Sequence, residues 1–317
     1  MRGLAALAIL VVHVTIFSGA SEASYARFLL HMDIGVPFFF LLSAFLLYRP
    51  FVAARVHGYP RSSFGGYAKR RFLRIAPAYW LVLTVAAIVP GFAGAFSGNW
   101  WVYYGLLQNL PVYTAEGGCA VDAYRCGVPV AWSLSVEVGF YLALPFFVLL
   151  MAGLNRRFGD RGWLRLELWA ATVLTAISIL ILTVPPDTDL LLWVFYSPFG
   201  RGLWFAAGLA LAALSVHAQI GEEPRAVSWL RDHPGPPLAA AAVLYIVACL
   251  VLNETLLAFP IAGQGAFVAW NIVVGVIAAL ALLPAIFGAE GGGLPRRALR
   301  HPTLRWLGLV SYGIFLW

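Results

Sequence analysis

Two ionisable side chains in the first apolar run, Arg2 and His13, have the types and the spacing to support chemistry. On an α-helix, which rises about 1.5 Å per residue, they are separated by about 16 Å along the axis. That is about half of the roughly 30 Å hydrocarbon core of a bilayer. A guanidinium binds phosphate oxygens, and a neutral imidazole accepts a proton as a general base. Because ionisable groups at this depth are costly, we interpret the pair as part of a functional site.

The composition of the 317-residue chain is typical of a membrane protein, with 62% hydrophobic and only 11% charged residues. Soluble domains carry about 25% charged residues, so this composition excludes a soluble protein. Several apolar runs reach the roughly 20 residues that cross a bilayer, and they leave no room for a separate soluble domain. We therefore predict one membrane-embedded domain over residues 1–317, of the all-α class, folded as a polytopic transmembrane helix bundle.

We predict nine spans, with the N-terminus in the cytoplasm. They cover about 3–20, 33–52, 75–96, 133–153, 166–184, 198–216, 236–252, 263–287 and 306 onward. The last run reaches Trp317 before it is long enough to span, so we expect a truncated ninth span and a domain that is incomplete at its C-terminus. The aromatic stretch 100–113 is too short to span and is predicted to be an interfacial or re-entrant segment.

The basic residues indicate topology rather than nucleic-acid binding. All but three of the 21 lie at Arg2 or in the connections 49–74, 154–165, 217–233 and 289–305. Only Arg27, Arg125 and Arg201 lie elsewhere. Alternate connections rich in arginine follow the positive-inside rule. This pattern predicts a multi-pass protein of the cell membrane with no nucleic-acid partner.

Two of the three cysteines flank a short polar stretch that is predicted to lie outside. Cys119 and Cys126 could form a disulfide in an oxidising compartment, or remain as two free thiols. No Cys or His pair stands near them, so we predict no metal site. Cys249 lies within an apolar run.

Six stretches of the chain resemble acyltransferase family 3, whose members are multi-spanning membrane enzymes that acylate sugars and related hydroxyl compounds. They are RGLAALAILVVH (2–13), DIGVPFFFLLSAFLLYRPF (33–51), RRFLRIAPAYW (70–80), WSLSVEVGFYLALPFF (132–147), RGLWFAAGLALA (201–212) and LGLVSYGIFLW (307–317). One departure is Ser43-Ala44-Phe45, where members usually carry Ser-Gly-Phe. Alanine is still small, so we expect this change to be tolerated. The resemblance implies an O-acyltransferase and is silent on its substrate.

The basic residues indicate which molecule donates the acyl group. Arg70 and Arg74 share a helix face, Arg71 lies one turn from Arg74, and Arg2 is placed at the same inner surface. Guanidinium groups suit the phosphates of coenzyme A, so we predict acyl-CoA, and specifically acetyl-CoA, as the donor, with no tightly bound cofactor. The alternative is an ordinary positive-inside patch on anionic lipid.

His13 is the predicted general base for the acceptor hydroxyl. The alternative is a buried histidine that donates to a backbone carbonyl and locks helices together. Glu137, one turn after Ser133, could orient His13, bind a sugar hydroxyl or form a structural pair with Arg201. Ser133, Trp132, Tyr141 and Arg201 are predicted to bind the substrate, a carbohydrate, glycolipid or other hydroxyl acceptor. Trp132 and Tyr141 fit an interfacial aromatic belt equally well.

His31 and Asp33 could form a second acid–base pair that faces the acceptor, although a helix-capping role for Asp33 is the simpler interpretation. The main alternative function is a transporter or flippase of a lipid-linked sugar, which would need mid-membrane polar groups and basic inner loops but no acyl transfer. Consumption of labelled acetyl-CoA distinguishes the two.

Overall fold

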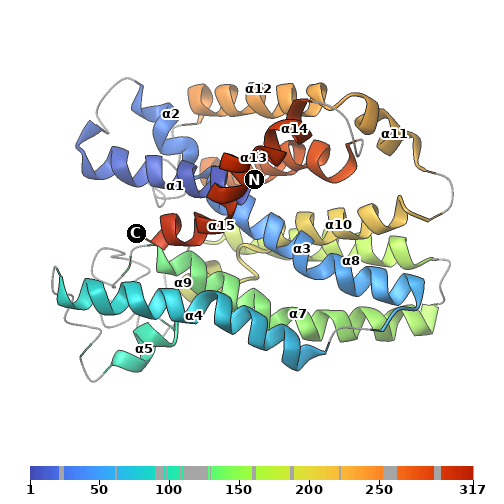
Figure 1. Ribbon diagram of the computed structural model, residues 1–317, viewed down its shortest axis with the longest axis horizontal. Helices are drawn as coiled ribbons and strands as arrows, with labels where there is room; N and C mark the ends of the chain where they lie inside the picture. Colours follow the sequence, from blue (N-terminus) through green and yellow to red (C-terminus); the bar gives the residue numbers. More distant parts are fainter. Residues whose placement is uncertain are drawn as a thin grey trace. The chain divides into compact units, whose positions relative to one another are not determined.

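The computed structural model describes residues 1–20, 25–60, 63–89, 96, 99–107, 109, 128, 130–158, 162–185, 189–220, 223–252, 263–288 and 294–316. Within these ranges every regular element is a helix and no strand occurs (Figure 1). The all-α prediction is confirmed for the described part of the chain. Cys119 and Cys126 lie outside the described residues.

Helices are present in all nine predicted segments. They are α1 (Arg2–Phe17), α3 (Gly35–His57), α4 (Phe64–Ile88), α7 (Ala131–Phe158), α8 (Trp163–Thr183), α10 (Gly202–His217), α12 (Gly235–Val251), α13 (Gln264–Phe287) and α15 (Pro302–Leu316). The shorter elements are α2 (Ala26–Leu30), η2 (His31–Ile34), α5 (Trp100–Tyr104), α9 (Asp189–Phe195), α11 (Arg225–Asp232) and α14 (Leu294–Arg300).

The number of membrane spans differs from the prediction. In the described chain, 5 helical segments are long and apolar enough to cross a membrane, or 6 if the bent pair α11 and α12 counts as one span. The continuous run Ala26–His57, α4, α7, α8 and α13 are the segments that pass. Helices α1 and α10 are apolar but only 16 residues long, which is below the usual 17–25 for a spanning helix. Nine spans are therefore not confirmed.

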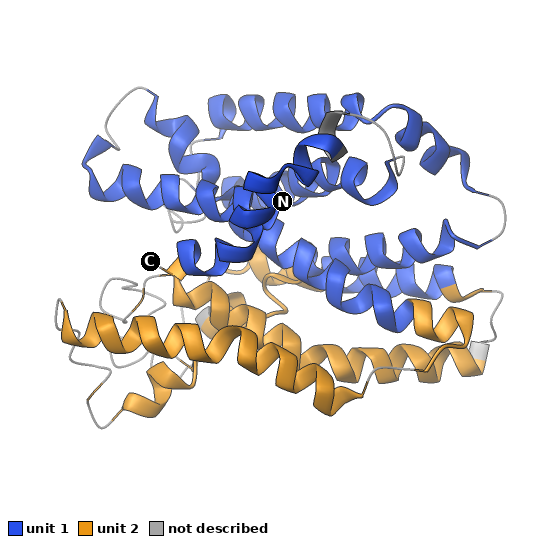
Figure 2. Cartoon of the chain, in the orientation of Figure 1, with its two compact units in different colours: residues 1–52, 164–175, 203–315 blue, residues 53–163, 176–202, 316–317 orange. Residues whose placement is uncertain are grey.

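The helices gather into two compact units, each made of discontinuous stretches of chain (Figure 2). Unit 1 comprises Met1–Val52, Leu164–Thr175 and Leu203–Phe315, and unit 2 comprises Ala53–Trp163, Ala176–Gly202 and Leu316–Trp317. The prediction of one domain over residues 1–317 remains a prediction.

Unit 1 is held together by close helix packing around α3, α10 and α13. Phe40 of α3 stacks on Phe205 of α10, with ring centroids 4.8 Å apart. The indole of the fully buried Trp204 donates to the carbonyl of Asn271 on α13 over 2.9 Å. Small residues permit this approach: a Cβ on Gly208 would lie 2.7 Å from the Cβ of Ala44. Ala44 therefore contacts α10 at a glycine. Because Gly208 has no side chain, there is room for the methyl group of Ala44 at this contact.

The glycine at this contact leads to a stability prediction. A Cβ added at Gly208 would lie 2.2 Å from the carbonyl oxygen of Leu41, which is backbone and cannot rotate away. We expect Gly208→Ala to force α3 and α10 apart and to lower the free energy of unfolding by about 1–3 kcal/mol or more. Thermal unfolding in detergent measures this. The control is Gly308→Ala in α15, where nothing lies within 4 Å of the added Cβ. Equal midpoints for the two variants would contradict the prediction.

Unit 2 is organised by hydrogen bonds from long aromatic side chains of α4. The hydroxyl of Tyr79 donates to the carbonyl of Tyr103 over 2.8 Å, and the indole of Trp80 donates to that of Tyr104 over 2.8 Å. These bonds fix the five-residue helix α5 against α4. In the predicted interfacial stretch 100–113, the described residues thus form only a short helix with exposed tryptophans, Trp100 and Trp101. It is too short to span, as the sequence indicates.

Candidate active site

His13 lies near the middle of α1, and its ring orientation is defined by a bond within its own helix. Its Nδ1 donates to the carbonyl oxygen of Ile9 over 2.8 Å, one turn earlier. When Nδ1 carries the proton of a neutral imidazole, Nε2 carries the lone pair and can accept a proton. The ring is half-buried and faces Phe17 with a centroid separation of 6.4 Å. This bond joins no second helix, so it does not lock helices together.

Arg2 is the first residue of α1 and is half-buried. The neighbouring Gly3 lies against α15: a Cβ there would approach the Cβ of Leu307 to 2.7 Å. The start of α1 is thus packed directly on the last helix. Arg2 and His13 both belong to unit 1, whereas Arg201 and the predicted site residues of α4 and α7 belong to unit 2.

The three arginines of α4 divide into two groups. Arg70 and Arg74 are exposed, which agrees with their expected common face. Arg71 instead turns toward α7, where its guanidinium carbon lies 5.8 Å from the ring centroid of Tyr141. Its Nε is buried and makes no hydrogen bond to any described residue. Two of the arginines are therefore available at the surface, and one is part of a polar cluster within unit 2.

Glu137 and Tyr141, one turn apart on α7, form the rest of this cluster. The Tyr141 hydroxyl donates to Oε1 of Glu137 over 2.5 Å. The hydroxyl of Tyr67 on α4 donates to the backbone carbonyl of Tyr141 over 3.1 Å. Tyr141 contacts both Arg71 and Glu137. Because Tyr141 is buried, these contacts lie in the interior of the unit and not in an aromatic belt at the surface.

Arg201 is completely buried, immediately before α10. Its guanidinium carbon lies 4.7 Å from the ring centroid of Phe195, 5.3 Å from that of Tyr196 and 5.7 Å from that of Trp132. These three rings come from the end of α9, the turn after it and the start of α7. Arg201 and Trp132 are thus neighbours, as a shared substrate site requires.

Ser133 occupies the first turn of α7, and its hydroxyl donates to the carbonyl of Val130 over 2.9 Å. This bond occupies the hydroxyl hydrogen, and the side chain is buried. Ser133 can still accept a hydrogen bond, but its role in the described structure is to support the start of α7.

His31 is buried, and both of its ring nitrogens lie near backbone carbonyls; the acid–base pair with Asp33 stays a prediction. Its Nδ1 contacts the carbonyl oxygen of Arg27, and its Nε2 lies 3.0 Å from that of Leu252. With both ring nitrogens on backbone carbonyls, the imidazole links η2 to the end of α12. Asp33 is buried within η2, and its capping role stays a prediction.

The sequence reasoning missed one buried polar pair in unit 1. The hydroxyl of Tyr48 on α3 donates to Oε2 of Glu167 on α8 over 2.7 Å, and both side chains are buried. A carboxylate inside the predicted span 166–184 is itself a signal, because charged residues in spans are rare. Among the described residues, no group of three His, Cys, Asp or Glu side chains is arranged to hold a metal ion.

Comparisons with known proteins identify the family. The pattern of the family described as "Acyltransferase domain", which is acyltransferase family 3, matches residues 1–317. The peptidoglycan O-acetyltransferase OatA of Listeria monocytogenes is 25% identical over 100% of this chain and 47% of its own length. The putative peptidoglycan O-acetyltransferase YrhL of Bacillus subtilis is 23% identical over 90% of this chain and 43% of its own length.

The chain thus spans less than half the length of these two relatives. No solved structure is significantly similar to it. Because the family pattern covers the chain from end to end, the protein belongs to acyltransferase family 3.

Proposed function

We propose that this protein is a multi-pass O-acyltransferase of the cell membrane, with a cytoplasmic N-terminus, that moves an acetyl group from acetyl-CoA to a carbohydrate hydroxyl. The observation that carries the proposal is the bond from His13 to the Ile9 carbonyl, which leaves Nε2 as the basic nitrogen. The description of the family as an acyltransferase domain favours acyl transfer over the transporter alternative.

His13 acts as the general base in a direct transfer. As the acceptor oxygen attacks the thioester carbonyl, Nε2 removes its proton and an ester C–O bond forms. The C–S bond breaks, and the proton that His13 received passes to the leaving thiolate of coenzyme A. The products are the acylated acceptor and free coenzyme A, and the imidazole returns to its neutral form.

The arginines bind the charged end of the donor. Arg70 and Arg74 are exposed on α4 and, by the positive-inside rule, face the cytoplasm where acyl-CoA is found. Arg2, at the start of the helix that carries His13, is a further guanidinium for the phosphates. Arg71 supports the exposed pair from within, through its contact with Tyr141. A planar guanidinium donates two parallel hydrogen bonds to the oxygens of one phosphate, which suits the phosphates of coenzyme A.

The acceptor side involves α7 and the turn before α10. Glu137 is held by Tyr141 and can orient a hydroxyl, while Trp132 and Arg201 offer an aromatic surface and a charge to a sugar. Both relatives are named for peptidoglycan, so a cell-wall glycan is the acceptor that we favour.

The test is transfer of labelled acetyl groups in membranes that contain the chain. We expect label from acetyl-CoA to enter a peptidoglycan-fragment acceptor as an ester that mild alkali releases. Membranes without the chain provide the background. Labelled acetyl phosphate is the competing donor: transfer from it but not from acetyl-CoA would overturn the assigned donor. No alkali-labile label from either donor would overturn the proposed function.

A further inference from the structure

Unit 1 contains a cavity of about 660 Å³ that no part of the proposed reaction uses. It lies among α3, α10, α11 and α13, and its volume is within the range of ligand pockets in proteins. One wall is apolar, with Phe45 and Leu46 from α3 and Ile286 from α13. Leu46 is 45% exposed, so the apolar wall reaches the protein surface.

The same cavity also carries a cation held by neutral partners. Nε of Arg49 donates to the hydroxyl of Ser215 over 3.0 Å, and Nη2 donates to Oε1 of Gln219 over 2.9 Å. All three residues line the cavity. These bonds orient the guanidinium without neutralising it, and they leave N–H groups on Nη1 and Nη2 for an anionic ligand.

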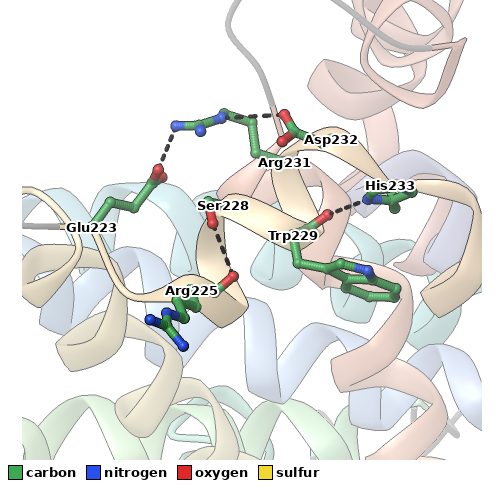
Figure 3. Close-up of polar contacts among 7 residues, drawn as sticks. All are labelled: Glu223, Arg225, Ser228, Trp229, Arg231, Asp232 and His233. Carbon is green, nitrogen blue, oxygen red and sulfur yellow. Dashed lines mark hydrogen bonds and ion pairs between the residues drawn. The ribbon is translucent and has the colours of Figure 1, made fainter.

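The second cation of the cavity is already paired. Nη1 of Arg231 donates to Oε2 of Glu223 over 2.5 Å, and Nε of Arg231 lies 3.6 Å from the carboxylate of Asp232 (Figure 3). Arg231 and Glu223 both line the cavity, and their charges cancel. Among the described side chains that line the cavity, the charge that remains is that of Arg49, so the cavity is complementary to an anion beside an apolar group.

Helix α11, which contributes Val227 and Arg231 to the cavity lining, has the features of a helix at the membrane–water interface. It makes an angle of 83° with α12, and the start of α12 is marked by Pro234 and Gly235. Trp229 is 49% exposed and stacks on His233, with ring centroids 5.3 Å apart (Figure 3). A short amphipathic helix with an exposed tryptophan lies well at the level of lipid headgroups.

We propose that this cavity binds an anionic phospholipid of the inner leaflet, with its phosphate on Arg49 and an acyl chain along Phe45, Leu46 and Ile286. The 217–233 connection is assigned to the cytoplasmic side by its charge, and basic pockets between membrane helices on that side bind anionic headgroups. A lipid chain enters laterally past the exposed Leu46, which a water-soluble anion has no need to contact. The site is separate from the proposed transfer and would stand if that proposal failed.

Native mass spectrometry of the purified chain in detergent tests the site, with phosphatidylglycerol, phosphatidylcholine and inorganic phosphate as probes. We expect one tightly retained phosphatidylglycerol and no equivalent phosphatidylcholine or phosphate adduct. Arg49→Gln removes the charge-assisted bonds and should weaken phosphatidylglycerol binding by about tenfold or more. Ala218→Phe keeps Arg49 but fills the cavity, and should weaken binding similarly. The control Arg225→Gln changes an exposed arginine of α11 and should bind as the wild type does.

Three outcomes would overturn the assignment. Equal retention of phosphatidylglycerol by Arg49→Gln, Ala218→Phe and the wild type would place the lipid elsewhere. Equal retention of phosphatidylcholine would remove the role of the charge. Displacement of bound phosphatidylglycerol by millimolar coenzyme A would assign the cavity to the acyl donor instead. Each result is read without an acyl-transfer assay, so failure of the lipid site and failure of the proposed function are distinguishable.

Discussion

Replacing His13 with asparagine is expected to lower acetyl transfer by about 10²- to 10⁴-fold, because general-base catalysis typically contributes that much. The amide nitrogen of asparagine can take the place of Nδ1 and donate to the Ile9 carbonyl, 2.8 Å from Nδ1 in the structure. The local bond within α1 is thus retained while the basic Nε2 is lost. The measurement is the initial rate of label transfer from acetyl-CoA, normalised to the amount of folded protein.

Thr15→Val provides the matched control on the same helix. The Thr15 hydroxyl donates to the carbonyl of Val11 over 2.8 Å, one turn back, as His13 donates to Ile9. Thr15 is buried, and valine has nearly its shape but cannot donate. We expect this variant to transfer acetyl groups close to the wild-type rate. A fully active His13→Asn variant would show that the imidazole is not the base, whatever the control does.

Helix positions were predictable from the sequence because apolar runs and their flanking charges are local signals. The segments 133–153 and 263–287, for example, correspond to α7 and α13. The number of spans was harder to predict, since a helix such as α10 is apolar over most of its length yet ends after 16 residues. The break between α11 and α12 did have a local signal, because proline disfavours helix at the residue before it and Pro234 lies at the bend.

The partners of site residues were not predictable, because they depend on contacts between helices far apart in the chain. Nothing in the segment 70–74 indicates that Arg71 turns toward Tyr141 while Arg70 and Arg74 stay exposed. The bond from Arg49 to Ser215 joins residues 166 positions apart. Glu137 is the exception, because its partner Tyr141 lies one turn along the same helix, a spacing that the sequence itself contains.

Arg201→Lys is expected to lower the free energy of unfolding by about 2 kcal/mol or more, although the charge is retained. The flat guanidinium lies within 6 Å of Phe195, Tyr196 and Trp132 at once. A lysine ammonium is a compact, strongly hydrated charge that cannot cover three rings, and burying it costs more than burying a guanidinium. The midpoint of thermal unfolding in detergent measures the effect. Arg27→Lys is the control, because that arginine is exposed.

The same variant separates a structural role of Arg201 from contact with the acceptor. At a temperature where the lysine variant is fully folded, loss of an acceptor contact raises the KM for the peptidoglycan fragment and leaves the KM for acetyl-CoA unchanged. A lower unfolding midpoint with both KM values unchanged would show that Arg201 only stabilises the rings around it, and would remove it from the acceptor site. Equal midpoints for Arg201→Lys and the wild type would contradict the stabilising role of the three ring contacts. Because Trp132 contacts Arg201 from the start of α7, a raised acceptor KM would also support the placement of the acceptor beside Glu137 on that helix.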